Sequence, residues 1–200
     1  MTQATAHIVD DDEAIRDALS WLLRSRDVSV RAWESGEAFL AGFSQSTGGC
    51  IVLDVRMDGM SGFEVHDQLL GRGCRVPVIF LTGHGDVPQA VAALKKGAFD
   101  FIEKPFNDNQ LVDRVIEAMR SHEAKRQELE AEASVAVCLA QLTPRERQVM
   151  ERVLAGDYNK SIADALGIAI RTVEVHRARI FEKMGIRSAV ELARLLGRRN

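Results

Sequence analysis

The sequence predicts an α/β front domain built on a five-stranded parallel sheet, followed by a helical linker and a small all-α domain. Three observations carry this prediction. Residues 1–120 alternate between short apolar runs and longer segments with helical periodicity, as successive βα units do. Residues 121–141 contain no proline or glycine and are rich in Ala and Glu. From residue 142 onward, the pattern is helical with short turns.

The five apolar runs are too short for helices and are typical of strands buried in a parallel sheet. The expected strands are Ala6–Asp10, Val28–Trp33, Cys50–Asp54, Val76–Leu81 and Phe99–Ile102. The periodic segments around them predict helices, because apolar residues recur at three- and four-residue spacing. The expected helices are Glu13–Arg24, Ser35–Phe43, Gly62–Leu70, Val87–Lys96 and Asp108–Arg120.

Composition favours an ordinary globular protein of the cytoplasm. The 200 residues suit two small domains, and 46% are hydrophobic and 28% charged. The longest apolar runs are too short to span a bilayer, and residues 1–5 carry no basic-then-apolar leader, so we expect no membrane partner. The three cysteines lack metal-site spacing, which favours free thiols in a reducing compartment.

Charge is distributed unevenly along the chain. Residues 1–120 hold 12 basic and 18 acidic residues, a balance of −6, whereas residues 142–200 hold 12 basic and 7 acidic residues, a balance of +5. An acidic front and a basic tail indicate a nucleic-acid partner for the tail only.

Polar residues follow four of the expected strands. Asp10 and Asp11 come after the first strand, Asp54 ends the third, and Thr82 and Lys104 follow the fourth and fifth. Alone, each is better explained as a cap or a surface ion pair. If these strands are neighbours, however, all five side chains converge at one edge of the sheet. Clustered carboxylates favour Mg²⁺, and a nearby ammonium and hydroxyl favour phosphoryl chemistry.

The segments HIVDDDEAIRDAL, IVLDVRMDGMSGFEV and VIFLTGHGDVPQAVAALKKGAFDFIEKPF resemble the receiver domain of two-component response regulators across residues 1–120. The resemblance implies a flavodoxin-like sheet with strand order 2-1-3-4-5. It implies that Asp54 accepts a phosphoryl group from a sensor histidine kinase, and that phosphorylation favours a homodimer. Mg²⁺ is the implied cofactor, held by Asp10, Asp11, Asp54 and the backbone carbonyl of Arg56. The implied switch and phosphoryl-binding residues are Thr82, Lys104 and Phe101, and the Lys104–Pro105 peptide is implied to be cis.

Three residues of this region need separate interpretation. Asp58 stands where the receiver family usually has proline, which predicts a looser loop and more negative charge near Asp54. Asp12 exceeds the usual acidic pair, and we expect it to cap the first helix. His84 is expected to be a loop residue rather than a ligand.

The tail predicts a helix-turn-helix domain over residues 142–200. Thr143 and Glu146 form a capping-box pattern with Pro144 at the first helical position. Further helices are expected at Asn159–Leu166, Thr172–Met184 and Ser188–Leu196, with Gly167 in the turn. The linker, residues 121–141, is expected to continue the preceding helix as a solvated connector, with a self-pairing coiled coil as the alternative.

Small and polar residues on the outward side of 172–184 suit a helix that enters the major groove of double-stranded DNA. The segment LTPRERQVMERVLAGDYNKSIADALGIAIRTVEVHRARIFEKMGIRSAVELARLL resembles the LuxR/NarL-type helix-turn-helix, and more closely the FixJ-like branch. The chain is thus identified as a DNA-binding transcriptional regulator, with RNA polymerase as an implied partner. The expected DNA contacts are Lys160, Arg171, Thr172, Glu174, Val175, Arg177, Ala178, Arg179 and Lys183.

Two other functions fit parts of the same pattern. Asp10 and Asp12 form a D-x-D after the first strand, as in Mg²⁺-dependent haloacid-dehalogenase-like phosphohydrolases, in which Asp10 would be the nucleophile. Alternatively, the front domain dimerises constitutively and never takes up phosphate. The regulator hypothesis is preferred because it also explains Thr82, Lys104 and the basic tail, and on this hypothesis the protein is not an enzyme.

Overall fold

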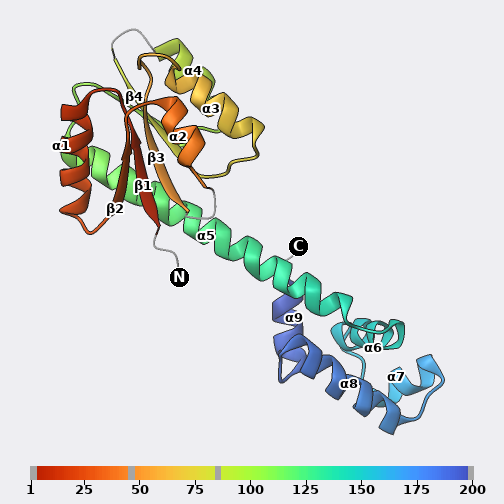
Figure 1. The fold of residues 1–200 in the computed structure, drawn as a ribbon. Coiled ribbons are helices and arrows are strands. Elements are labelled where there is room, and N and C mark those ends of the chain that lie inside the picture. The colour runs from red at the N-terminus through yellow and green to blue at the C-terminus, as the bar shows by residue number, and fades with distance from the viewer. Residues whose placement is uncertain (1–3, 45–47, 84–86, 198–200) are drawn as a thin grey trace. The chain divides into compact units, whose positions relative to one another are not determined.

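The computed structural model describes residues 4–44, 48–83 and 87–197 (Figure 1). The chain divides into two compact units, residues 1–126 and 127–200, which are described separately. His84 lies outside the described residues. In the described part, no helix combines the length and the apolar character needed to cross a lipid bilayer.

The front unit is built on a five-stranded parallel sheet with strand order β2-β1-β3-β4-β5. The strands are β1 (Thr5–Val9), β2 (Ser29–Trp33), β3 (Gly49–Asp54), β4 (Val78–Thr82) and β5 (Asp100–Glu103). Every residue of β3 and β4 is buried, as expected for apolar runs at the centre of a sheet that is covered on both faces. The predicted fold class and strand order are confirmed.

Helices cover both faces of this sheet (Figure 1). They are α1 (Glu13–Arg24), α2 (Gly36–Gly42), α3 (Gly62–Gly71), α4 (Val87–Lys95) and α5 (Asp108–Ala140). The side chains of successive β3 residues point to opposite faces of the sheet. Val52 packs in the apolar cluster with α1 and α5, whereas Ile51 and Leu53 pack in the cluster with α2, α3 and α4. The two central strands β3 and β4 are thus buried along their length, and they present polar side chains at their carboxyl ends.

Helices of the front unit begin at caps that the local sequence provides, and those of α1 and α3 adjoin the acidic residues. The Asp12 side chain accepts hydrogen bonds from the backbone N–H groups of Ala14 and Ile15, at 2.8 and 3.4 Å, so its predicted capping role is confirmed. Ser61 and Glu64 form a reciprocal capping box at the start of α3. Both caps stand next to loops at the carboxyl edge of the sheet, and they fix where those loops end.

The predicted helical continuation after residue 120 is present, because α5 runs without a break to Ala140 and contains the boundary between the units. The second unit also contains α6 (Pro144–Leu154), α7 (Asn159–Leu166), α8 (Ile170–Met184) and α9 (Ala189–Gly197). Its core is formed by Val149, Ile162, Val173, Ile180 and Leu192, none more than 1% exposed. Val135, Cys138 and Leu139 of α5 pack against this core. The end of the linker is therefore part of the packed unit, and a fully solvated connector was the wrong expectation there.

Glycines end both helices of the helix-turn-helix, and Gly167 lies in the turn between them. Gly167 ends α7 and Gly185 ends α8, each with φ near +64°, a left-handed conformation that favours glycine. At the start of α6, Thr143 and Glu146 form the predicted capping box. α8 therefore follows α7 after a tight turn and is held against it by the shared core.

Candidate carboxylate site and nucleic-acid interface

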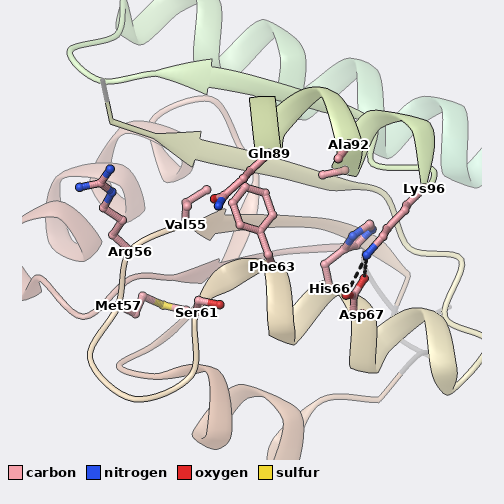
Figure 2. A pocket seen from close by; sticks show the side chains of 11 residues that line it. Val55, Arg56, Met57, Ser61, Phe63, His66, Asp67, Gln89, Ala92 and Lys96 are labelled. Carbon is pink, nitrogen blue, oxygen red and sulfur yellow. Dashed lines mark hydrogen bonds and ion pairs between the residues drawn. The ribbon is translucent and has the colours of Figure 1, made fainter. Parts of the chain in front are cut away.

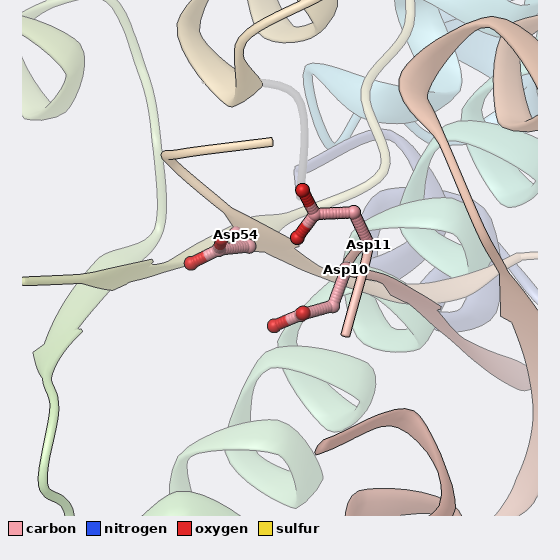
Figure 3. Close-up of side chains that lie close together, drawn as sticks. All are labelled: Asp10, Asp11 and Asp54. Atoms are coloured by element: carbon pink, nitrogen blue, oxygen red, sulfur yellow. The ribbon is translucent and has the colours of Figure 1, made fainter. Parts of the chain in front are cut away.

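Three carboxylates meet at the C-terminal edge of the sheet (Figure 3). β1 and β3 pair in register, with Val9 opposite Leu53, so Asp10 and Asp54 come next on neighbouring strands. Asp10, Asp11 and Asp54 each place a carboxylate oxygen within 4.8 Å of those of the other two. Asp10 and Asp54 are buried, whereas Asp11 is exposed. The site is therefore open on the Asp11 side.

Lys104 brings a positive charge to two of these carboxylates. Its Nζ donates to Asp54 Oδ1 at 2.8 Å and to Asp10 Oδ2 at 3.0 Å. The residue follows β5, and its backbone N–H donates to the carbonyl of Thr82 at the end of β4, at 2.7 Å. The Lys104–Pro105 peptide bond is cis. The ammonium therefore reaches across β4 to β3 and β1 from a well-anchored backbone.

Burial raises the pKa of Asp54, because a charged carboxylate is poorly solvated there. The hydrogen bond and charge of Lys104 oppose this rise, while the charges of Asp10 and Asp11 add to it. For Lys104, burial works against the charged form, but the hydrogen bonds to Asp54 and Asp10 outweigh it and the pKa of Lys104 is raised. Lys104 is thus cationic. A further positive charge near Asp54 would stabilise its ionised carboxylate, which burial and the neighbouring aspartates disfavour.

The remaining predicted residues of the front unit lie around this cluster. Thr82 is buried at the end of β4, and Phe101 is half-buried in β5, opposite Phe80 of β4. Arg56 is exposed in the loop after Asp54. That loop returns closely to the strand, since a Cβ at Gly62 would lie 2.2 Å from the carbonyl oxygen of Asp54. Only glycine fits at position 62 without moving the phosphoacceptor candidate.

An open pocket lies beside the carboxylate site and does not include its three aspartates. This open pocket of about 730 Å³ is lined by residues of the β3–α3 loop, α3 and α4, including Arg56, Phe63 and Gln89 (Figure 2). Its Lys96 is bonded to Asp67 at 2.7 and 2.8 Å. None of Asp10, Asp11 or Asp54 lines it. The titratable cluster, at the edge of the sheet, is therefore the better candidate for chemistry.

The donor set suits a small hard cation. All three groups offer carboxylate oxygens, and each pair of like charges about 5 Å apart repels by roughly 3 kcal/mol at an effective dielectric of 20. A divalent ion with oxygen ligands removes that repulsion, and Mg²⁺ is commonly bound by one or two carboxylates with waters and a phosphate oxygen. Asp10, Asp11 and Asp54 therefore fit the predicted cofactor.

Sequence reasoning missed one residue that fixes the acidic loop. Arg16 Nη1 donates to the backbone carbonyls of Asp10 and Asp11, both at 2.8 Å. These bonds hold the loop after β1 against the first turns of α1. An arginine at a polar position of an amphipathic helix gives no sequence signal for such a contact, because its partners are backbone atoms.

The residues that are predicted to contact DNA lie on α8 and at the start of α7 of the second unit. Val173, Ile180 and Met184 of α8 are buried in the core, as predicted. Most of the expected DNA contacts are exposed; these are Lys160, Arg171, Thr172, Glu174, Val175, Ala178 and Arg179. Arg171 and Glu174 are bonded to each other at 3.0 Å. Val175 is 40% exposed, although it is apolar. An exposed apolar side chain among basic ones suits contact with a thymine methyl group in the major groove.

The other two expected contacts, Arg177 and Lys183, are half-buried and engaged within the unit. Arg177 Nη1 donates to Asn159 Oδ1 at 2.8 Å, which links α8 to the start of α7. Lys183 Nζ donates to the buried Glu146 at 2.7 Å and to the carbonyl of Gln141 at 3.1 Å. The Lys183 ammonium therefore makes two hydrogen bonds within the unit, and its contact with DNA stays a prediction.

Both units match known families. Residues 6–116 match the family described as response regulator receiver domain, and residues 140–196 match bacterial regulatory proteins of the luxR family. The C4-dicarboxylate transport transcriptional regulatory protein DctR of Rhodobacter capsulatus is 52% identical over 193 residues, 96% of this chain and 98% of that protein.

Solved structures cover the whole chain as well. The response regulator StyR aligns with a TM-score of 0.88 and 38% identity, covering 98% of this chain and 99% of StyR. Full-length FixJ from B. japonicum aligns with a TM-score of 0.62 and 42% identity, covering 99% of this chain and 98% of FixJ. These similarities extend over both units, so they concern the domain combination and not the receiver fold alone.

Proposed function

The chain belongs to the two-component response regulators that join a receiver domain to a LuxR-type DNA-binding domain, and we propose that Asp54 is the residue through which it is switched. The observation that carries this proposal is the position of Asp54: it ends β3 within 4.8 Å of two other carboxylates and 2.8 Å from the ammonium of Lys104. Asp10 lies near both kinds of neighbour as well, but it also accepts a hydrogen bond from the backbone N–H of Asp12.

The proposed reaction transfers a phosphoryl group from a phosphohistidine of a sensor histidine kinase. The N–P bond of the donor breaks, an Asp54 oxygen forms the new P–O bond, and the donor imidazole takes up a proton after its release. Lys104 is already cationic and lies beside Asp54, so it can shift its hydrogen bond to a phosphoryl oxygen without a change in protonation. Thr82, at the end of the adjacent strand, supplies a hydroxyl for the same group.

Mg²⁺ would be held by Asp10, Asp11, Asp54 and the backbone carbonyl of Arg56, and it would neutralise charge on the transferred group. Asp10 is also kept in place by the backbone N–H of Asp12, which donates to Asp10 Oδ1 at 2.9 Å. The protein groups therefore need little rearrangement to receive a phosphoryl group, which supports Asp54 as an acceptor.

The proposed output is binding of double-stranded DNA by α8 of residues 142–200, with residues 121–141 as the linker and residues 1–120 as the receiver. Phosphorylation of Asp54 would draw Thr82 inward, and Phe101 would follow it, which changes the face formed by α4, β5 and α5. That face would pair with a second copy, and two DNA-binding units would occupy two half-sites and act on RNA polymerase. Two modules are needed because one buries too little surface for specific affinity.

The phosphohydrolase alternative has no support from the family matches. The proposed nucleophile of that alternative, Asp10, is only 1% exposed and is already bonded to Lys104 and to the Asp12 N–H. Asp54 is also buried, at 6% exposed, and bonded to Lys104, so burial alone does not decide between the two carboxylates, and the family matches favour the regulator.

The test is phosphoryl uptake from acetyl phosphate, with and without Mg²⁺, read by intact mass. The wild-type chain should gain one phosphoryl group only with Mg²⁺ present, and Asp54→Asn should gain none. Asp58→Asn is the matched control, because it removes a carboxylate from the same loop without touching the acceptor. Uptake by Asp54→Asn at the wild-type rate would refute the assignment. Sizing chromatography of the same samples separates switched dimers from constitutive ones.

A further inference from the structure

The loop between β3 and α3 is attached at two points, to a carboxylate in the loop after β1 and to a carboxylate in the first turn of α2. The backbone N–H of Asp58 donates to Asp11 Oδ2 at 2.8 Å. Two residues later, the backbone N–H of Met60 donates to Glu37 Oε1 at 3.0 Å. Gly59 between them has φ of +80°, a turn conformation that favours glycine. These two hydrogen bonds attach the loop on either side of Gly59, and a loosening effect of Asp58 relative to proline stays a prediction.

Asp11 depends on that contact more than its two neighbours in the cluster do. Asp10 and Asp54 are buried and bonded to Lys104, but Asp11 is exposed. Among the described residues, the Asp58 N–H is the single hydrogen-bond donor to the Asp11 carboxylate. Repulsion from Asp10 and Asp54 favours rotation of Asp11 away from the cluster. The bond to Asp58 opposes this rotation and keeps Asp11 within 4.8 Å of the other two.

We propose that the backbone N–H of Asp58 is a positioning group of the carboxylate site, which holds Asp11 in the orientation that a divalent cation requires. This inference rests on the proposed function, because it concerns the metal that the acceptor site would use. It adds a residue that the family resemblance does not supply, since proline, the residue usual at this position, has no N–H to donate.

The geometry leaves Asp11 able to bind a cation while bonded. A carboxylate has two oxygens with about four acceptor directions, so Oδ2 can accept from Asp58 while Oδ1 remains free. Arg56, whose carbonyl is a proposed ligand, lies two residues before Asp58 in the same loop. One hydrogen bond therefore couples two proposed ligands, as outer-shell contacts do when they orient metal-binding carboxylates.

The contact uses the backbone of residue 58, so side-chain changes and backbone changes have different effects. Asp58→Ala removes the carboxylate and keeps the N–H, whereas Asp58→Pro removes both. The difference between these two variants isolates the donor. Glu37→Gln and Glu37→Ala form a second pair at the other attachment point, because Gln keeps a side-chain oxygen that can accept from Met60 and Ala does not.

The first measurement needs no metal. In ¹⁵N-labelled full-length protein, the Asp58 amide proton should be shifted downfield and protected from exchange, and both effects should be lost in Asp11→Ala. The second measurement is a MgCl₂ titration followed by the same amide spectra. Asp58→Ala should bind Mg²⁺ with a Kd within about twofold of the wild type, and Asp58→Pro should bind about tenfold more weakly. Thermal unfolding should be similar for Ala and Pro, which separates positioning from a general loss of structure.

Each outcome decides between specific claims. Equal Mg²⁺ affinity in the Ala and Pro variants, or an Asp58 amide that does not respond to Asp11→Ala, would overturn the positioning role and leave the proposed acceptor site standing. Failure of the wild-type chain to bind Mg²⁺ at all would overturn both proposals. If Asp58→Pro does not fold, the amide response to Asp11→Ala and the Glu37 pair decide the question, with Glu37→Ala expected to weaken Mg²⁺ binding and Glu37→Gln to preserve it.

Discussion

The ammonium of Lys104 is bonded to the carboxylate of Asp54 at 2.8 Å, although Lys104 follows β5 and Asp54 ends β3, with β4 between them. The same ammonium bonds Asp10, which follows β1, at 3.0 Å. One cation thus compensates two buried carboxylates. Because a buried charge without a partner is costly, this pairing governs the stability of the front unit as well as its chemistry.

We predict that Lys104→Met lowers the unfolding free energy of the front unit by about 3 kcal/mol, because it leaves Asp10 and Asp54 without their cation. Combining it with Asp54→Asn should recover part of this loss, since the double variant has one fewer unpaired charge. Tryptophan fluorescence in urea follows this unit selectively, because both tryptophans, Trp21 and Trp33, lie in it. Full additivity of the two single changes would show that the charges are not coupled.

Asp54→Asn alone should stabilise the front unit at pH 7 by about 1 kcal/mol, the balance between relief of carboxylate repulsion and loss of the Lys104 ion pair. Burial raises the pKa of Asp54, so the folded state binds this proton more tightly than the unfolded state. The wild-type chain therefore loses stability as the pH rises from 3.8 through the folded pKa, and the Asn variant lacks this loss. The difference between the two urea midpoints should shrink on acidification. A constant difference would argue against ionisation as its cause.

His7 of β1 should make the front unit sensitive to mild acid. Burial, with help from the charge of Arg31, lowers the pKa of His7 to about 4. His7 Nδ1 accepts a hydrogen bond from Trp33 Nε1 at 3.1 Å, and a proton on Nδ1 would displace that donor. Because the folded pKa is below the ordinary value of 6.5, the stabilising contribution is complete above pH 6.5 and is lost as the pH falls towards 4.

We expect this loss to reach about 3 kcal/mol in the wild-type chain and to be absent from His7→Phe. Urea unfolding of both proteins at a series of pH values between 7 and 4 measures it. The comparison removes contributions that the substitution does not affect, so the difference isolates His7. Parallel pH profiles would mean that the imidazole at position 7 is not the source.

The ion pair formed by Glu146 and Lys183 should stabilise the second unit, as the ion pairs of Lys104 stabilise the front unit. The hydrogen bond from Lys183, followed by that from the Thr143 backbone, lowers the pKa of Glu146 to about 2. Lys183→Met should destabilise residues 127–200 by about 2 kcal/mol at pH 7. Since the folded pKa lies below the ordinary 4.5, this contribution is present above pH 4.5 and is lost as the pH falls towards 2.

Circular dichroism of the full chain measures this change, with tryptophan fluorescence as the internal control for the front unit. The helical transition of Lys183→Met should move to lower urea while the fluorescence transition stays in place. Movement of both transitions would show that the pair acts beyond its own unit.

The strands, helices and converging acids were predictable because each has a local signature. Apolar runs mark the buried strands, and residues that follow parallel strands must share an edge. The boundaries of the strands differ from the predicted ones: β4 begins at Val78 and not at Val76, and it includes Thr82. Contacts such as Arg16 with two backbone carbonyls, or Lys183 with Glu146 across 37 positions, were not predictable, since they join surface-type residues that show no pattern.

The basic face of α8 gives a final prediction about DNA. Arg179 is exposed on this helix, and we expect it to contact a phosphate. Arg179→Ala should weaken binding to a generic DNA duplex and reduce the slope of log affinity against log salt by about 1, because one fewer counterion is released. Arg194→Ala is the matched control: it removes the same charge from an exposed position of α9. Its slope should equal that of the wild type. Equal slopes for all three proteins would mean that Arg179 does not touch the duplex and that the groove-facing surface must be sought elsewhere on the unit.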